Sequence, residues 1–118
     1  MRRWNGWGDE ANDFPLKPSA HRFLADLIGP GARLGDATLA DVMARVPASR
    51  LPRHPLVSTD TETRVRHARG QSLPDWLALR SGEFGVFPDG VAFPENAQQV
   101  RELLQFALAH DVSVIPYG

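Results

Sequence analysis

Apolar and polar residues follow a helical period most clearly near the end of the chain. Between residues 97 and 109, apolar side chains recur three and four positions apart, at Val100, Leu103, Leu104, Ala107 and Leu108. This spacing places them on one face of a helix. Asn96, with Gln99 three positions later, forms a capping-box pattern that marks where such a helix begins. The sequence therefore predicts an amphipathic helix over residues 96–110.

Short apolar runs flank this predicted helix on both sides. Val91–Phe93 ends at Pro94, and residues 112–115 are apolar and rich in β-branched side chains. Runs of this length and composition are typical of buried strands. Strand, helix and strand within about 25 residues form a βαβ unit with a right-handed crossover. We therefore expect the two strands to be parallel neighbours covered by the apolar stripe, namely Leu103, Leu104, Ala107 and Leu108.

The N-terminal segment predicts an extended arm followed by a short helix. Trp4 and Trp7 stand among glycines, a composition that favours irregular chain anchored by aromatic side chains. We expect both tryptophans to pack mainly on domains outside this chain and so to remain partly exposed. An apolar stripe over residues 23–28 then indicates a helix that ends at Gly29-Pro30, with Ser19 as its expected N-cap.

A second short helix is predicted over residues 39–46. Its apolar residues recur with helical spacing, and it ends before Pro47, because a proline disfavours helical backbone in the residue that precedes it. Thr38 or Asp36 is expected to cap it. Residues 47–59 contain three prolines and should form an exposed connector.

The middle of the chain predicts one short strand and one capped helix. Residues 63–69 alternate loosely between polar and apolar side chains, which favours a short strand. Ser72 and Asp75 then form a capping box, followed by a helix that Gly82 closes. Arg80 lies near the end of that helix, where a cation binds the last carbonyl groups and interacts favourably with the helix dipole.

The bulk composition excludes several classes of function. Of the 118 residues, 42% are hydrophobic and 23% are charged, as in ordinary globular proteins. The net charge of −1 gives no reason to expect a nucleic-acid partner or an anionic membrane. Because there is no cysteine, disulfides, thiolate nucleophiles and zinc–thiolate sites are excluded. The four histidines lack metal-ligand spacing, so no metal site is expected.

Targeting signals are also missing from the sequence pattern. The N-terminal residues are basic and then aromatic, without the apolar stretch of a secretory signal. No apolar run approaches the ~20 residues that a membrane span needs. No membrane span is therefore expected, and the protein is taken to be cytoplasmic.

One histidine lies within a basic cluster. His67 is flanked by Arg64, Arg66 and Arg69. Such a group can meet a phosphate-bearing substrate, but it is more often a solvated strand or a salt-bridged face between elements. We favour the second interpretation.

The last residues, Pro116, Tyr117 and Gly118, are the candidate cofactor-binding residues. They follow a predicted strand and enter a turn in which glycine lets the backbone approach an anion closely. Pro116 has no N–H group, so only Tyr117 and Gly118 can donate hydrogen bonds. Many strands end in such a turn without binding a ligand, and the pattern alone does not separate the two cases.

The order of these motifs resembles a known family. The stretch from Phe93 to Gly118 is similar to the first FAD-binding half-motif of the vanillyl-alcohol-oxidase/PCMH flavoprotein superfamily, in which a Pro-x-Gly turn opens the loop that holds the flavin pyrophosphate. Residues 3–8 (RWNGWG), 64–73 (RVRHARGQSL) and 77–82 (LALRSG) resemble its alkyldihydroxyacetonephosphate synthase branch, which includes bacterial FAD-linked oxidases.

This resemblance implies a function and a domain division. It implies an FAD enzyme that exchanges an acyl chain for a fatty alcohol on acylated dihydroxyacetone phosphate, in ether-lipid synthesis. Two alternatives to this function are considered. One is a 2-hydroxy-acid oxidase or dehydrogenase of the same superfamily, and the other, from another class, is a helical interaction module without a cofactor. The expected substrate is a small molecule or a lipid phosphate, and the whole protein is expected to form a homodimer.

The expected architecture is α+β and incomplete. Residues 1–82 are expected to form an arm and helical region. Residues 83–118 are expected to be the start of an FAD-binding PCMH-type domain, with the last residue of the given sequence inside the flavin loop. The family's catalytic residues lie downstream, so no catalytic residue is assigned in this chain. Residues 1–118 alone are expected to be inactive and to bind no flavin detectably.

Overall fold

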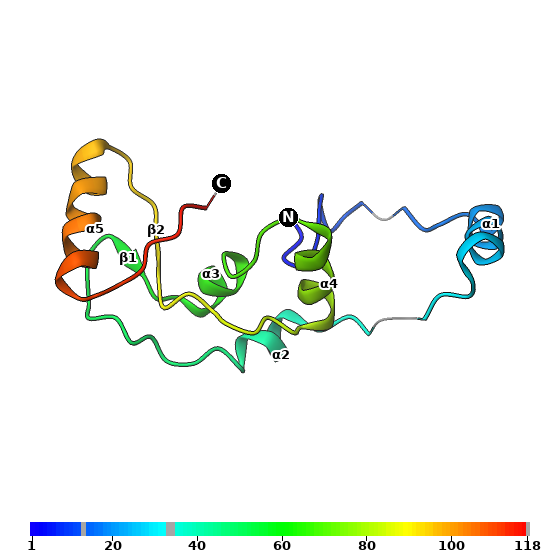
Figure 1. Cartoon of the computed structure of the whole chain (residues 1–118), viewed down its shortest axis with the longest axis horizontal. Coiled ribbons are helices and arrows are strands. Elements are labelled where there is room, and N and C mark those ends of the chain that lie inside the picture. The colour runs from blue at the N-terminus through cyan, green and yellow to red at the C-terminus, as the bar shows by residue number, and fades with distance from the viewer. Residues whose placement is uncertain (13, 33–34, 118) are drawn as a thin grey trace.

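The computed structural model describes residues 1–12, 14–32 and 35–117, and in them the chain is α+β. An antiparallel pair of strands and five helices make up its regular structure. The elements are α1 (Pro18–Ile28), α2 (Leu39–Met43), β1 (Val57–Ser58), α3 (Thr61–Arg66), α4 (Leu73–Ser81), β2 (Val91–Ala92) and α5 (Ala97–Ala109). Figure 1 shows an elongated molecule with α1 at one end, α5 at the other and the remaining helices between them; its extents are 56 × 28 × 25 Å.

A small core holds the middle of the molecule together. Val42 of α2, Val65 of α3 and Leu79 of α4 are buried against Phe84, which follows α4 and is 2% exposed. Burial of each such side chain contributes about 1.5–3 kcal/mol. Phe87 stacks on Phe84 at a ring-centroid distance of 5.1 Å. The core therefore joins three helices to the segment that leads toward β2.

Side-chain caps begin four of the five described helices. Thr38 accepts a hydrogen bond from the backbone N–H of Asp41, which confirms one of the two predicted caps of α2. The capping box of Ser72 and Asp75 is also confirmed, and Gly82 ends α4 in the left-handed region with φ of 75°. Each cap satisfies a backbone donor that has no partner inside its own helix.

Two predicted caps differ in detail from the structure. Asn96 caps α5 by accepting from the N–H of Gln99, as predicted, but the Gln99 side chain accepts from Glu95 rather than from Asn96. Ser19 is not a cap, because α1 begins one residue earlier at Pro18 with Lys17 in the N-cap position. Proline suits the first helical position, where its missing N–H costs nothing.

The strand predicted over residues 63–69 was wrong. Residues Thr61–Arg66 form helix α3, which begins where Asp60 accepts from the N–H and the hydroxyl of Thr63. Arg64 and Val65 are adjacent and both buried, whereas successive strand side chains point to opposite faces. The local alternation was too short to outweigh the cap.

The predicted parallel βαβ unit is not formed either. The apolar run at 91–93 does supply strand β2, but β2 pairs antiparallel with β1, with Val57 opposite Ala92. Residues 112–115 are not in a strand. A strand needs a hydrogen-bonding neighbour, and among the described residues no strand pairs with this segment.

The apolar stripe of α5 is consequently only partly covered. Ala107 is buried and Leu103 is half-buried, but Leu104 is 49% and Leu108 84% exposed. After α5, Asp111 adopts a left-handed φ of 53° and the N–H of Val112 reaches back to the carbonyl of Ala107. This Schellman-type turn sends residues 112–117 back toward the middle of the molecule (Figure 1).

The aromatic arm docks on this chain's own core. Trp4 stacks on Phe84 at 6.4 Å, and Trp7 lies against Trp76 of α4 at 4.5 Å. Trp4 is half-buried and Trp7 is 58% exposed, so the predicted partial exposure is confirmed. Helix α4 and the segment after it supply packing partners within this chain, and the expectation that further partners lie outside it stays a prediction.

Candidate functional site

The predicted cofactor loop lies against the end of α3. Gly118 lies outside the described residues, whereas Pro116 and Tyr117 follow the segment that returns from α5. The Tyr117 hydroxyl donates to the carbonyl of Arg66 at 3.4 Å, and its ring meets the ring of His67 edge-on at 4.9 Å. Helix α3 leaves this last carbonyl without an intrahelical partner, so it is open to an outside donor.

His67 is held on three sides. One ring nitrogen, Nδ1, lies 2.7 Å from the carbonyl oxygen of Thr63. Because a carbonyl oxygen only accepts hydrogen bonds, Nδ1 carries the hydrogen and is the donor in this contact. Phe93, directly after β2, packs edge-on against the same ring at 5.3 Å. His67 therefore lies between Phe93 and Tyr117, at the junction of α3, β2 and the candidate loop.

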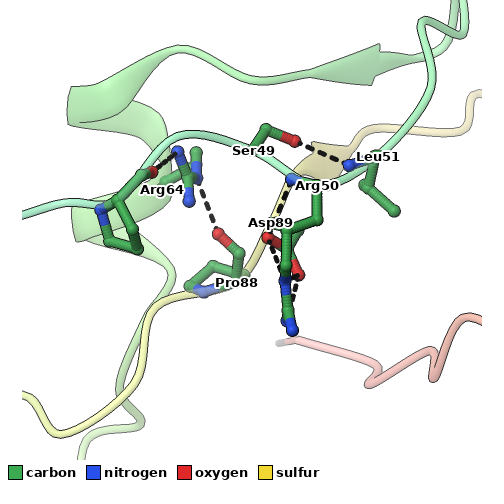
Figure 2. A network of polar contacts seen from close by, with 7 residues as sticks. Ser49, Arg50, Leu51, Arg64, Pro88 and Asp89 are labelled. Atoms are coloured by element: carbon green, nitrogen blue, oxygen red, sulfur yellow. Dashed lines mark hydrogen bonds and ion pairs between the residues drawn. The ribbon is translucent and has the colours of Figure 1, made fainter.

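Arg64 is a structural residue, not part of a solvated face. Its side chain is 3% exposed, and its guanidinium donates to the carbonyls of Pro88 at 2.7 Å and Pro47 at 2.8 Å (Figure 2). The interpretation of the basic cluster as a solvated strand was wrong for this residue. Its location in a capped helix was the signal to look for, since Asp60 and Thr63 have the N-cap spacing.

The other two arginines of the basic cluster form ion pairs. Arg66 pairs with Glu62 one helical turn earlier, at 2.7 Å. Arg69 lies 3.9 Å from Asp75 of α4 and donates to the carbonyl of Phe84. The interpretation as a salt-bridged face thus fits Arg66 and Arg69, because both guanidinium groups already pair with carboxylates of this chain.

A second contact joins the two segments that Arg64 bridges, the one after α2 and the one before β2. Arg50 and Asp89 form an ion pair of 2.6 Å, and the backbone N–H of Arg50 also donates to the Asp89 carboxylate (Figure 2). The Arg50 side chain lowers the pKa of Asp89 and the carboxylate raises the pKa of Arg50. Together with Arg64, this pair holds in place the segment just before β2, which leads to Phe93.

Arg80 differs from its predicted role. Its guanidinium lies 3.1 Å from the carboxylate of Asp36 and 6.0 Å from the ring centroid of Trp76. The carbonyl of Arg80 accepts from the N–H of Ala37, so α4 is joined at its end to the segment before α2. Arg80 therefore binds a neighbouring segment and an aromatic ring rather than the last carbonyls of its own helix.

The described residues offer one amide of a possible phosphate site. Tyr117 is 45% exposed, and within the described part of the chain its backbone N–H has no hydrogen-bond partner. Pro116 is exposed and has no N–H to offer. This geometry is compatible with one donor of an anion-binding set, since such sites use several successive amides.

Other kinds of site receive no support from the part of the chain that is described. No group of three or more His, Asp or Glu side chains is placed there to hold a metal ion. No helix there is both long and apolar enough to cross a membrane. An open hollow of about 590 Å³ lies in the proline-rich connector, lined by residues between Ser49 and Thr59, and contains none of the predicted site residues.

Sequence comparison gives consistent relatives, although no protein family model matches the chain. An alkyldihydroxyacetonephosphate synthase of Caenorhabditis elegans is 22% identical over an alignment 144 residues long with its gaps, and the alignment covers 98% of this chain and 24% of that protein. Proteins of the same name from Dictyostelium discoideum and Trypanosoma brucei brucei are each 26% identical, over 98% of this chain and 25% and 24% of their own lengths.

Structural comparison agrees with the sequence. Two solved crystal forms of an alkyldihydroxyacetonephosphate synthase superpose with a TM-score of 0.63 at 22% identity, over 99% of this chain and 28% and 27% of the solved chains. The chain thus spans about a quarter of the length of the relatives it matches. Over nearly its whole length, in sequence and in fold, it resembles part of the alkyldihydroxyacetonephosphate synthases.

Proposed function

We propose that this chain belongs to an FAD-dependent enzyme of the alkyldihydroxyacetonephosphate synthase type. The observation that supports this proposal most strongly is the match to synthases from three organisms, each over 98% of the chain. The matches span nearly the whole chain rather than one motif. They cover only about a quarter of each relative, so the activity of the whole enzyme is inferred from its resemblance.

The proposed reaction exchanges the acyl chain of acylated dihydroxyacetone phosphate for a fatty alcohol. The ester is lost as a fatty acid and an ether bond to the alcohol takes its place, without net oxidation. Bound FAD would supply the electrophilic centre for this exchange. No catalytic residue is assigned to this chain, and the proposed substrate is a lipid phosphate.

The proposed part of this chain in the enzyme is to hold the flavin. The N–H groups of Tyr117 and Gly118 would donate to the pyrophosphate, with Pro116 fixing the backbone that enters the turn. Residues 83–118 would begin the flavin domain and residues 1–82 would precede it. A cytoplasmic homodimer remains part of the proposal.

The exchange reaction itself is the direct test. The protein, at the full length that its gene encodes, is incubated with acyl-dihydroxyacetone phosphate and an isotopically labelled fatty alcohol. We expect labelled ether product and released fatty acid in equal amounts, without oxygen consumption. Reduction of the flavin by a 2-hydroxy acid, with no ether product, would instead assign the protein to the oxidase class and overturn the proposal.

A further inference from the structure

Tyr117 provides the side-chain contact between the candidate loop and the rest of the molecule. Within the described residues, the backbone N–H groups of residues 113–115 and of Tyr117 form no hydrogen bonds to the protein. The Tyr117 side chain, by contrast, makes both a hydrogen bond to the Arg66 carbonyl and an edge-on contact with the His67 ring. The position of the loop backbone is therefore set largely through one side chain.

His67 has the rigidity that such a contact requires. Its hydrogen bond to the Thr63 carbonyl fixes the plane of the ring, and Phe93 supports the ring from another side. The helix beneath is itself anchored, because Arg64 and Val65 are both buried. A ring fixed in this way can orient an aromatic neighbour, since edge-on pairs are stabilised beyond their buried area.

We propose that His67 is a positioning residue for flavin binding. It holds the side chain of Tyr117 and thereby places the backbone of the turn that would receive the flavin pyrophosphate. His67 acts through Tyr117 and touches neither flavin nor substrate. This inference rests on the proposed function and adds to it a role for a residue about 50 positions before the loop.

A double-mutant cycle on FAD affinity tests the proposal. FAD dissociation constants are measured for the full-length protein and for His67→Ala, Tyr117→Ala and the double variant. Aromatic-pair energies predict that each single change raises the dissociation constant about three- to tenfold. The double variant should be no weaker than the weaker single variant, because both changes remove the same contact.

Two further variants separate positioning from general damage. His54 packs against Phe106 at 4.6 Å, a comparable histidine–aromatic contact that does not involve the loop. His54→Ala should therefore leave the dissociation constant of FAD unchanged. Tyr117→Phe keeps the ring contact and loses only the hydroxyl bond to Arg66, so it should weaken FAD binding less than Tyr117→Ala does.

The outcomes distinguish failure of this inference from failure of the proposed function. If the wild-type protein binds FAD but the His67 and Tyr117 effects add independently, or His67→Ala has no effect, the positioning role is overturned and the function stands. If His67→Ala does not fold, His67→Leu replaces it in the cycle, because leucine keeps side-chain bulk without the aromatic ring. If the folded wild-type protein binds no FAD, the proposed function and the positioning role both fall.

Discussion

Arg64 carries its charge inside the protein without a carboxylate to neutralise it. Among the described residues no acidic side chain forms an ion pair with it; its Nε and Nη1 groups donate to the carbonyls of Pro88 and Pro47, whereas its buried Nη2 has no hydrogen-bond partner there. Burial of a charge is costly, and the cost is offset only when its hydrogen bonds are satisfied. The residue therefore joins two segments that are far apart in sequence, which composition could not reveal.

Replacement of Arg64 should destabilise the fold. Arg64→Met keeps much of the side-chain volume but removes the donor from both part-buried hydrogen bonds, and we expect a loss of about 2–4 kcal/mol. Denaturant unfolding measures it. Arg53→Met is the matched control, because Arg53 is exposed in the connector, and it should change stability by less than about 0.5 kcal/mol. Equal stability of the two variants would refute the structural role of Arg64.

Three aspartates make the fold sensitive to acid. The backbone N–H of Thr63 lowers the pKa of Asp60, the Ser72 side chain lowers that of Asp75, and the Arg50 side chain lowers that of Asp89. A carboxylate whose pKa is lower in the folded state contributes stability above its unfolded pKa of about 3.9. That contribution is lost as the pH falls through the folded pKa.

The stability of the fold should therefore decrease as the pH is lowered into the acid range. The denaturant midpoint should be steady from about pH 7 to pH 5 and fall below about pH 4. Asp89→Asn should be less stable at neutral pH and should lose less further stability on acidification, because one titrating group is gone. A variant whose midpoint falls as steeply as that of the wild type would show that Asp89 does not contribute in this way.

At the scale of elements, three caps were predictable and the strands were not, although Ser19 was wrongly expected to cap α1 and the Asp60 cap of α3 was missed. A cap depends on residues three positions apart, so Thr38, Ser72 and Asn96 could be identified from the sequence alone. A strand depends on a neighbour that local sequence does not name. Val91–Ala92 was correctly expected to be extended, but its partner proved to be β1, and residues 112–115 have no strand partner among the described residues.

Two serine substitutions test the observed helix starts. Ser72→Ala removes the side chain that accepts from the Asp75 N–H and should cost about 1 kcal/mol of stability. Ser19→Ala is the control, because Ser19 lies inside α1 and not at its cap; it should be within about 0.5 kcal/mol of the wild type. Thermal unfolding of both variants measures these changes. A larger loss of stability for Ser19→Ala than for Ser72→Ala would contradict the assignment of Ser72 as a cap and of Ser19 as an internal helix residue.

At the scale of the whole molecule, the fold positions the candidate loop through contacts far apart in sequence. The core centred on Val65, Leu79 and Phe84 supports α3, and α3 supports Tyr117 through Arg66 and His67. The sequence marked Pro116–Gly118 as a loop but gave no sign of where it would lie. The exposed apolar residues of α1, such as Phe23 and Ile28, remain without a packing partner among the described residues.

Flavin content is the most direct test of the central claim, that this chain holds FAD at residues 116–118. The full-length protein and its Gly118→Val variant are passed through gel filtration, and the visible absorbance of retained flavin is measured. We expect one FAD per wild-type chain, reduced occupancy in Gly118→Val, and none detectable on residues 1–118 alone, because too few amides can donate. Gly31→Val is the control, since a side chain there meets open space, and it should retain full occupancy. A fully loaded Gly118→Val protein, or residues 1–118 carrying stoichiometric flavin, would contradict the account.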